Sequence, residues 1–274
     1  MTLRRTLKRS LSTTTRGLLQ FGGGGAAPSY DTDAQTYITA VETADGQSLE
    51  TGVKDAINAF VVGCKSDGIW TAIKASCILA GARTLTGALV PLVGAAPTNN
   101  NFVSGDYSRT AGLTGDGSTK YLATNTLDSD YPQNNFHQSI YTTSAGTTGD
   151  VFGINPTTGA DSLMRPHTGF FRGRVSDLNY THSVAAPKSG LIAFSRSTST
   201  AYLARFGGTT DTVNQASATP QGISRAVFAN NAGAGAIGFA DATITFYSIG
   251  ESLDLALLDT RVTNLITAIG AAIP

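Results

Sequence analysis

Glutamate is nearly missing from this sequence of 274 residues. It occurs only at Glu42, Glu50 and Glu251, so the 200 residues between the last two contain none. Cleavage of a glycosidic bond by two carboxylates needs a nucleophile and an acid/base about 5 Å apart. A site that takes both groups from glutamates therefore cannot form in the central stretch, and only aspartates could replace them.

Cysteine, tryptophan and histidine are also scarce. Two Cys, one Trp and three His are spread over the chain without a CxxC pair or a spacing typical of a zinc site. Neither Gly-x-Ser-x-Gly nor a P-loop sequence is present. Zinc binding, a serine hydrolase of that type and P-loop nucleotide binding are therefore not indicated.

Charge and long apolar runs are in short supply as well. Only 14% of the residues are charged, and the 19 basic and 19 acidic side chains cancel. No run approaches the roughly 18 apolar residues of a membrane-spanning helix, so membrane insertion is not expected. A neutral chain also makes nucleic acid an unexpected partner. Thr, Ser, Asn, Gly and Ala fill the shortfall, which is typical of short strands and many turns.

The charges are unevenly placed, because every charge in the first 30 residues is positive. This arm carries +5 and the rest of the chain −5. Leucines recur at i, i+4 and i+8 and would share one face if the arm became helical, and four consecutive glycines at 22–25 form a hinge after it. We predict that the arm docks onto a partner through Leu3, Arg4, Arg5, Leu7, Lys8, Arg9 and Leu11.

Three other interpretations of the arm stay open. A secretory signal, including the twin-arginine type suggested by Arg4 and Arg5, needs an apolar core, whereas residues 10–16 are mostly hydroxyl side chains. A transit peptide fits the Arg, Ser and Thr content without acids. A solvated tail is the simplest alternative.

Three short helices are predicted early in the chain. Apolar positions recur at helical spacing over residues 31–44, 53–64 and 69–81. Trp70 opens the third helix, where a lone Trp is more often a core or interface residue than a ligand platform. Cys64 and Cys77 would lie about a turn out of register in a helical hairpin, so two buried free thiols are favoured over a disulfide.

A connector follows Gly81, and the pattern then changes to short runs rich in Tyr, Phe, Ile, Val and Thr between turn residues. Nine runs predict strands over residues 120–124, 136–143, 151–154, 170–175, 191–195, 201–206, 226–229, 236–239 and 243–249. They suffice for a two-sheet sandwich. A final helix is predicted with Ser252 or Asp254 as its cap and an apolar stripe of Leu253, Ala256, Leu257, Val262, Leu265 and Ile269.

Three segments resemble concanavalin A-like (laminin G-like) jelly rolls. The opening strand of that family is similar to residues 112–122, GLTGDGSTKYL, where a Gly/Asp turn precedes an aromatic. Its central hairpin is similar to LIAFS at 191–195 with AYLARFGG at 201–208, and its closing strand to ITFYSIGESLD at 244–254. The resemblance spans residues 105–265 and implies a mainly β, two-sheet jelly-roll sandwich.

The chain also resembles small virion structural proteins of tailed bacteriophages, especially those of cyanobacteria and marine bacteria. The residues that carry this resemblance are GCKSDGIWTAIKASCILAGARTL at 63–85 and NFVSGDY at 101–107. It implies a structural or binding role, transfers no catalytic residue, and does not extend to the arm before Asp31.

Few residues suggest chemistry or ligand binding. Asp128 and Asp130 would share one face of a strand, but Ser129 and the following Tyr-Pro favour a loop. With Asp106 or Asp116 they are the only candidates for a Ca²⁺ site, and otherwise no cofactor is expected. The candidate glycan or Ca²⁺ contacts are Asp128, Asp130, Tyr131 and Tyr180, with Tyr141 as a further stacking ring.

The most basic piece of the body is RPHTGFFRGR at 165–174. Interleaved arginines and aromatics can bind anionic polymers, although three arginines at the rim of a sandwich are more often solvated strand ends.

The sequence therefore predicts three parts: a basic docking arm with a glycine hinge (1–30), a helical segment with a connector (31–104), and a jelly-roll sandwich closed by a C-terminal helix (105–274). The leading hypothesis is a non-enzymatic virion component, either a capsid decoration protein or a tail or baseplate protein. Its expected partners are other virion proteins and further copies of itself. The alternative is a lectin-like module that binds a cell-surface glycan of the host.

Overall fold

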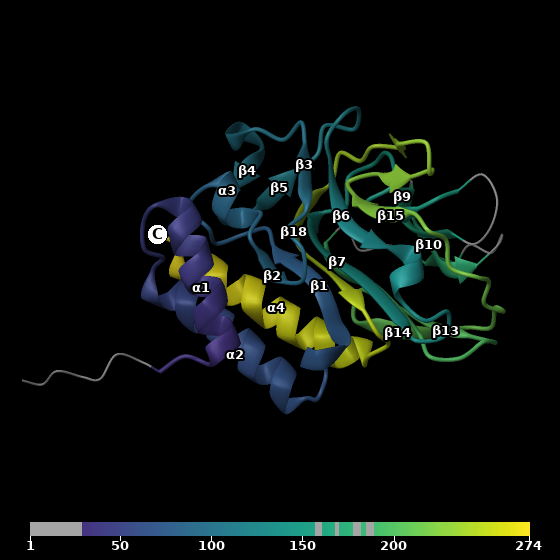
Figure 1. The fold of residues 1–274 in the computed structure, drawn as a ribbon, viewed down its shortest axis with the longest axis horizontal. Helices are drawn as coiled ribbons and strands as arrows, with labels where there is room; N and C mark the ends of the chain where they lie inside the picture. The colour runs from purple at the N-terminus through teal and green to yellow at the C-terminus, as the bar shows by residue number, and fades with distance from the viewer. Residues whose placement is uncertain (1–28, 157–160, 168–169, 178–181, 185–188) are drawn as a thin grey trace, which may run out of the picture.

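The computed structural model describes residues 29–156, 161–167, 170–177, 182–184 and 189–274 (Figure 1). The described helices are α1 (Thr32–Asp45), α2 (Thr51–Ser66), α3 (Leu85–Ala88) and α4 (Leu255–Ala272), with short 3₁₀ turns η1 (Trp70–Ala72), η2 (Ser104–Asp106) and η3 (Asp128–Asp130).

The first sheet has the strand order β14-β13-β12-β7-β18-β1-β2. In addition, β5 pairs with β18, and β4 pairs with β5. The strand pairs within it are antiparallel. Its members are β1 (Ile73–Ile78), β2 (Pro91–Val93), β4 (Tyr107–Ser108), β5 (Gly112–Thr114), β7 (Phe136–Ser144), β12 (Gly190–Arg196), β13 (Tyr202–Phe206), β14 (Thr209–Val213) and β18 (Thr243–Gly250).

The second sheet has the order β11-β10-β9-β8-β15-β6-β3. The short strand β16 pairs with β17 and runs parallel to β8. The members are β3 (Thr98–Asn100), β6 (Tyr121–Leu127), β8 (Phe152–Ile154), β9 (Asp161–His167), β10 (Phe170–Asp177), β11 (His182–Val184), β15 (Ser224–Val227), β16 (Asn230–Asn231) and β17 (Ala236–Ile237).

Two apolar clusters hold three layers together. The first lies between the sheets and includes Phe152, Phe194 and Tyr247. The second lies between the outer face of the first sheet and the helices, where the rings of Phe60 and Phe246 meet edge to face at 5.7 Å. The predicted class, a mainly β two-sheet jelly-roll sandwich preceded by short helices and closed by a C-terminal helix, is confirmed.

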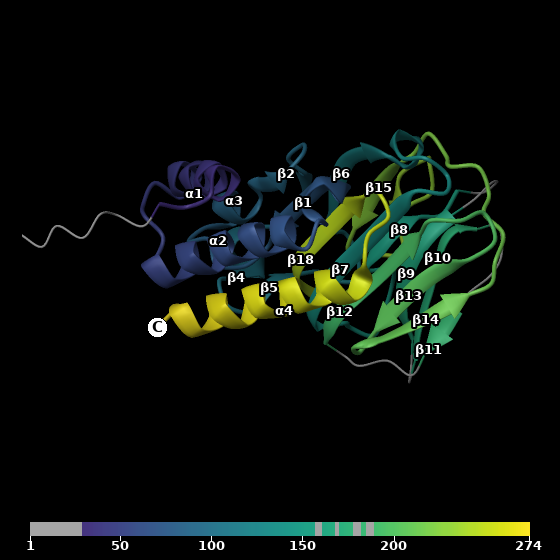
Figure 2. The same ribbon diagram turned by 90° about the horizontal axis from the view of Figure 1, so that it is seen from below.

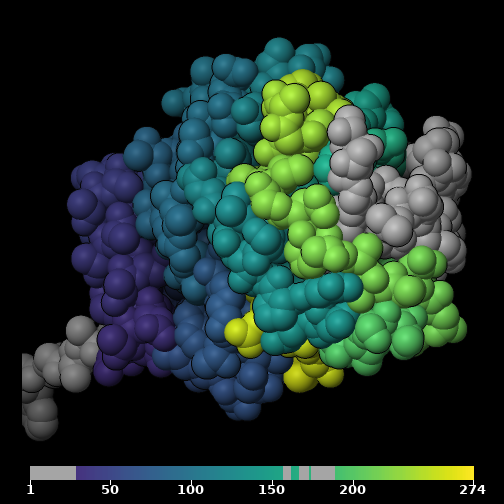
Figure 3. Space-filling view, turned by 45° about the vertical axis from the view of Figure 1, so that its right-hand side comes forward, coloured from purple at the N-terminus to yellow at the C-terminus, as the bar shows by residue number. Residues whose placement is uncertain are grey.

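Helices α2 and α4 lie side by side over the first sheet (Figure 2). Figure 3 shows the purple and blue helical segment at one end of the molecule, next to the teal and green strands. Helix α4 also meets the length and composition of a membrane span. The buried apolar side chains of α4 pack in the second cluster, as those of a core helix do.

The first two helices form as predicted. Ala34, Tyr37, Ile38 and Val41 are buried on α1, and the Asp31 carboxylate accepts the N–H of Asp33 as its N-cap. On α2 the predicted apolar positions are buried in the same way, including Cys64. Cys64 and Cys77 are both free and buried, as expected, and burial raises the pKa of each thiol to about 12.

The predicted third helix is wrong, because residues 69–81 form η1 and then the inner strand β1. Ala75 and Cys77 point into the cluster between the sheets, whereas Ile73 and Ile78 point to the helices. Residues 73–77 alternate apolar and polar side chains, but Ile69, Ile73 and Cys77 also recur every four residues, which favoured the helix. Strand β1 pairs with β18, which begins 170 residues later in the chain.

The connector also contributes to both sheets. Strand β2 ends the order of the first sheet and β3 that of the second. The helical segment thus shares its sheet with the sandwich, and the division at residues 104/105 stays a prediction. On α4, Asp254 is the cap as expected, but the buried stripe uses Leu255 and Leu258, whereas Leu257 is exposed.

Candidate functional site

The segment around Asp128 is a structural clamp. Asp128 is buried and forms an ion pair with the buried Arg225, and its other carboxylate oxygen accepts the N–H of Gln221 at 2.7 Å. The Arg225 guanidinium lies 4.2 Å from the centre of the Phe136 ring. Asp128 is therefore corrected from a candidate ligand contact to a buried ion-pair residue.

The neighbouring candidates also serve the fold. Asp130 is exposed, and one of its oxygens accepts the N–H of Leu127 at 2.6 Å, which closes the turn. Tyr131 is only 8% exposed and packs 5.7 Å from Phe136, so its ring has no free face for a sugar and the stacking prediction for it is wrong. Tyr180 lies outside the described residues, as do the arm residues Leu3, Arg4, Arg5, Leu7, Lys8, Arg9 and Leu11.

The other candidate acids are engaged as well. Asp106 bonds Lys120 at 2.6 Å. Asp116 accepts three successive backbone N–H groups from residues 118–120, which lower the pKa of its carboxyl group although burial opposes the shift. In the described ranges no group of three or more His, Cys, Asp or Glu side chains could hold a metal ion. Arg165, from the basic piece, bonds the buried Asp150 at 2.8 Å.

A buried serine–histidine chain joins β7 to β18. The His137 ring lies 3.0 Å from the Ser248 hydroxyl, which lies 2.7 Å from that of Ser139. The other His137 nitrogen is 2.6 Å from the carbonyl oxygen of Glu251. A serine beside an imidazole can act as a nucleophile with its base. All three side chains are fully buried, however, and burial lowers the pKa of His137 to about 4.

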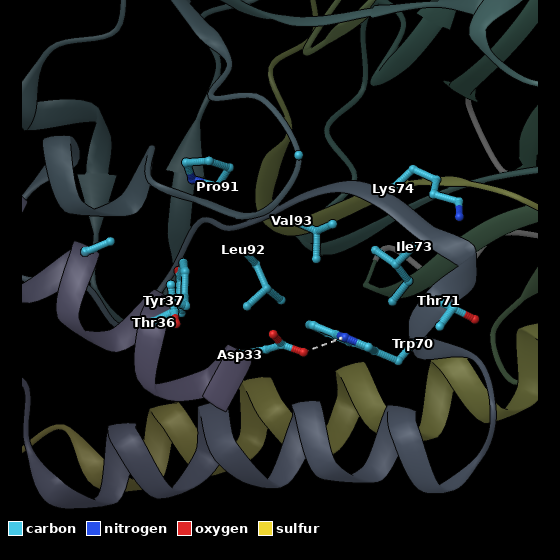
Figure 4. Close-up of a pocket in the computed structure, with 12 residues that line it drawn as sticks. Asp33, Thr36, Tyr37, Trp70, Thr71, Ile73, Lys74, Pro91, Leu92 and Val93 are labelled. Atoms are coloured by element: carbon cyan, nitrogen blue, oxygen red, sulfur yellow. Dashed lines mark hydrogen bonds between the residues drawn. The ribbon is translucent and has the colours of Figure 1, made fainter. Parts of the chain in front are cut away.

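A groove lies between α1, η1 and the end of the first sheet (Figure 4). Its volume is about 600 Å³. In Figure 4 the Trp70 indole forms one wall, and Leu92, Val93 and Ile73 point toward it. The groove is lined by Asp33, Thr36, Tyr37, Ala40, Trp70, Thr71, Ile73, Lys74, Pro91, Leu92, Val93 and Gly94.

The charges in this groove are paired and hold its shape. The Trp70 indole donates its N–H to an Asp33 carboxylate oxygen at 3.0 Å, and Lys65 bonds the same oxygen at 2.7 Å. At the other end Lys74 forms an ion pair with Glu251 at 3.0 Å. The walls between them are mostly apolar, so the groove suits an apolar segment.

Sequence reasoning missed the groove because it assigned residues 69–81 to a helix. The available signal was Trp70 itself, since a lone Trp is often an interface residue.

No family model and no curated protein matches the sequence. Three of the solved structures with a similar fold illustrate the likeness. The binding domain of botulinum neurotoxin serotype D is 8% identical, with a TM-score of 0.48, and the match covers 74% of this chain and 52% of that one. A Trypanosoma rangeli sialidase mutant is 10% identical, with a TM-score of 0.47 and coverage of 79% and 39%, and the mouse laminin alpha1 LG4-5 domains are 11% identical, with a TM-score of 0.35 and coverage of 61% and 47%. The chain thus spans about half or less of their length.

Proposed function

We propose that this chain is a non-enzymatic structural component of a tailed-phage virion, a capsid decoration, tail or baseplate protein that docks by its arm and displays its sandwich. The observation that carries the proposal is the separation of charge along the chain. Residues 1–30 carry +5 and the remainder −5, with four glycines between Phe21 and the first helix. Such an arm favours an acidic surface on another subunit.

The state of the carboxylates in the described sandwich supports a role without catalysis. Asp128, Asp150 and Asp106 each bond a cationic side chain, and the serine–histidine chain has no path to solvent. The purified protein should therefore show no turnover of polysaccharides, with or without Ca²⁺. Turnover that disappears in the exposed Asp130→Asn variant would contradict this.

Deletion of residues 1–25 tests the docking role. We expect the melting temperature to stay within a few degrees, because the deleted residues end in the glycine run before α1. The deleted chain should be missing from purified particles of the phage that encodes it, measured by mass spectrometry against the full chain. Incorporation at the normal level would refute the arm as the docking element.

The glycan-binding alternative now depends mainly on Tyr180, because Tyr131 lies in the core and Tyr141 is half-buried against the second apolar cluster. A lost aromatic stack costs about 1 to 2 kcal/mol, so Tyr180→Ala should weaken any glycan signal roughly tenfold. A blank glycan array supports the structural role, and a saturable hit lost in Tyr180→Ala supports the alternative.

A further inference from the structure

We propose that the groove lined by Trp70 and Leu92 receives the N-terminal arm of a second copy of this chain. This inference rests on the proposed function, in which the arm reaches outside its own subunit, and it identifies the arm's partner. Arm-to-groove contacts between identical copies close as a dimer when two copies exchange arms, and form rings or filaments when the contact runs head to tail.

The apolar character of the groove matches the arm. Trp70, Ile73, Leu92 and Val93 present apolar surface, and the arm carries leucines at i, i+4 and i+8. An amphipathic segment that lays such a face in a groove is a recurrent mode of recognition.

The dimensions also agree. The wall that α1 contributes runs from Asp33 to Ala40, which is about 10 Å along a helix. Leu3 to Leu11 would cover about 12 Å as a helix. The α1 wall and a helical arm segment are both about two turns long, so all three leucines of the arm can contact the groove.

Charge does not oppose this pairing. The groove is lined by one acid, Asp33, and one cation, Lys74, so its lining carries no net charge. Lys65 beside it is paired with Asp31 and Asp33, and Lys74 is paired with Glu251. The basic arm therefore meets no unpaired cation among these residues.

The groove also lies at the end of a sheet. In the described chain β2 is the terminal strand of the first sheet, and Leu92 and Val93 of this strand form one wall of the groove. Terminal strands are common places for another segment to add, because one side of their backbone is not used by the sheet.

Two variants separate the arm from the groove. Deletion of residues 1–25 removes the arm and keeps the groove. Ala40→Arg keeps the arm and fills the groove with a bulky cation, at an exposed α1 position that should tolerate it. The matched control is Thr39→Arg, which adds the same charge to the neighbouring exposed residue outside the groove.

Sedimentation velocity of the purified proteins then tests the proposal. The full chain and Thr39→Arg should form species heavier than the 28.2 kDa monomer, while the deletion and Ala40→Arg should each stay monomeric. An equimolar mixture of the two monomeric variants should form a one-to-one complex, because one supplies the groove and the other the arm. Circular dichroism and melting temperature confirm that each variant is folded.

A full chain that stays monomeric at all concentrations would overturn the inference, as would association that survives Ala40→Arg. Protection of the arm from protease in a monomeric full chain would show that the arm binds its own groove instead. The test needs no phage particle, so it is separable from the proposed function. An arm-dependent virion protein that never self-associates would refute this inference alone, and a self-associating chain that is absent from particles would refute only the virion role.

Discussion

Arg225 and Asp128 form an ion pair with almost no exposed side-chain surface. Removing one member of a buried pair leaves the other charge without compensation, which typically costs about 3 to 5 kcal/mol. Asp128→Asn should therefore lower the free energy of unfolding by about that amount in urea denaturation.

The control for this variant is the half-exposed pair of Lys74 and Glu251, where each side chain is 43% exposed. Lys74→Ala should cost less than about 1 kcal/mol, because solvent screens such pairs. Equal losses for the two variants would show that the Asp128 pair is not buried as described.

His137 should make the stability depend on pH. Burial, reinforced by the positive charge of Arg225, lowers its pKa from 6.5 to about 4, whereas the bond to the Glu251 carbonyl opposes the shift. Between these values the unfolded chain binds the proton more readily, so stability is full above pH 6.5 and falls as the pH drops toward 4. The total loss is about 3 kcal/mol.

Urea titrations at pH 7, 5.5 and 4.5 measure this loss, since most carboxylates titrate below that range. His137→Gln should flatten the dependence between pH 6.5 and 4.5. A wild-type stability that stays constant over this range would contradict the buried, neutral state of His137.

At the scale of elements, α4 allows a comparison within one helix. Leu258 is fully buried in the second apolar cluster, between the first sheet and the helices, whereas Leu257 is 37% exposed. Leu258→Ala should cost about 2 to 5 kcal/mol through lost burial and the cavity left behind, and Leu257→Ala less than about 1 kcal/mol. Urea denaturation of both variants checks the orientation of α4. A larger loss of stability for Leu257→Ala than for Leu258→Ala would support the apolar stripe predicted from the sequence, which included Leu257.

The elements also show which signals a sequence carries. Strand β7 and helix α2 were predictable, because apolar clusters bounded by turn residues and a helical apolar period are local patterns. Strand β1 was not, since Ile69, Ile73 and Cys77 fit a helical spacing and its partner β18 is remote in the chain.

The same limit applies to the candidate site. Asp128 and Tyr131 stood out by residue type, but the Arg225 that buries this segment lies almost 100 residues away. The groove depends on α1, η1 and β2 meeting in space, and of its wall residues only Trp70 carried a signal of its own. Long-range pairing determined both outcomes, and no local pattern encodes it.

At the scale of the whole molecule, the chain combines a basic arm, a helical layer with a groove, and a sandwich whose described acids are engaged internally. The proposed role in assembly rests on this arrangement and on the charge of the arm, which carries +5 against −5 on the rest of the chain.

The central claim is the proposed virion role, and cryo-electron microscopy of a tailed phage whose genome encodes this chain tests it most directly. The account predicts repeated copies of the sandwich on the particle surface, each joined to a neighbouring subunit by density that continues from the N-terminus of α1. A particle without the sandwich, or one in which the sandwich attaches while that density contacts no neighbour, would contradict it.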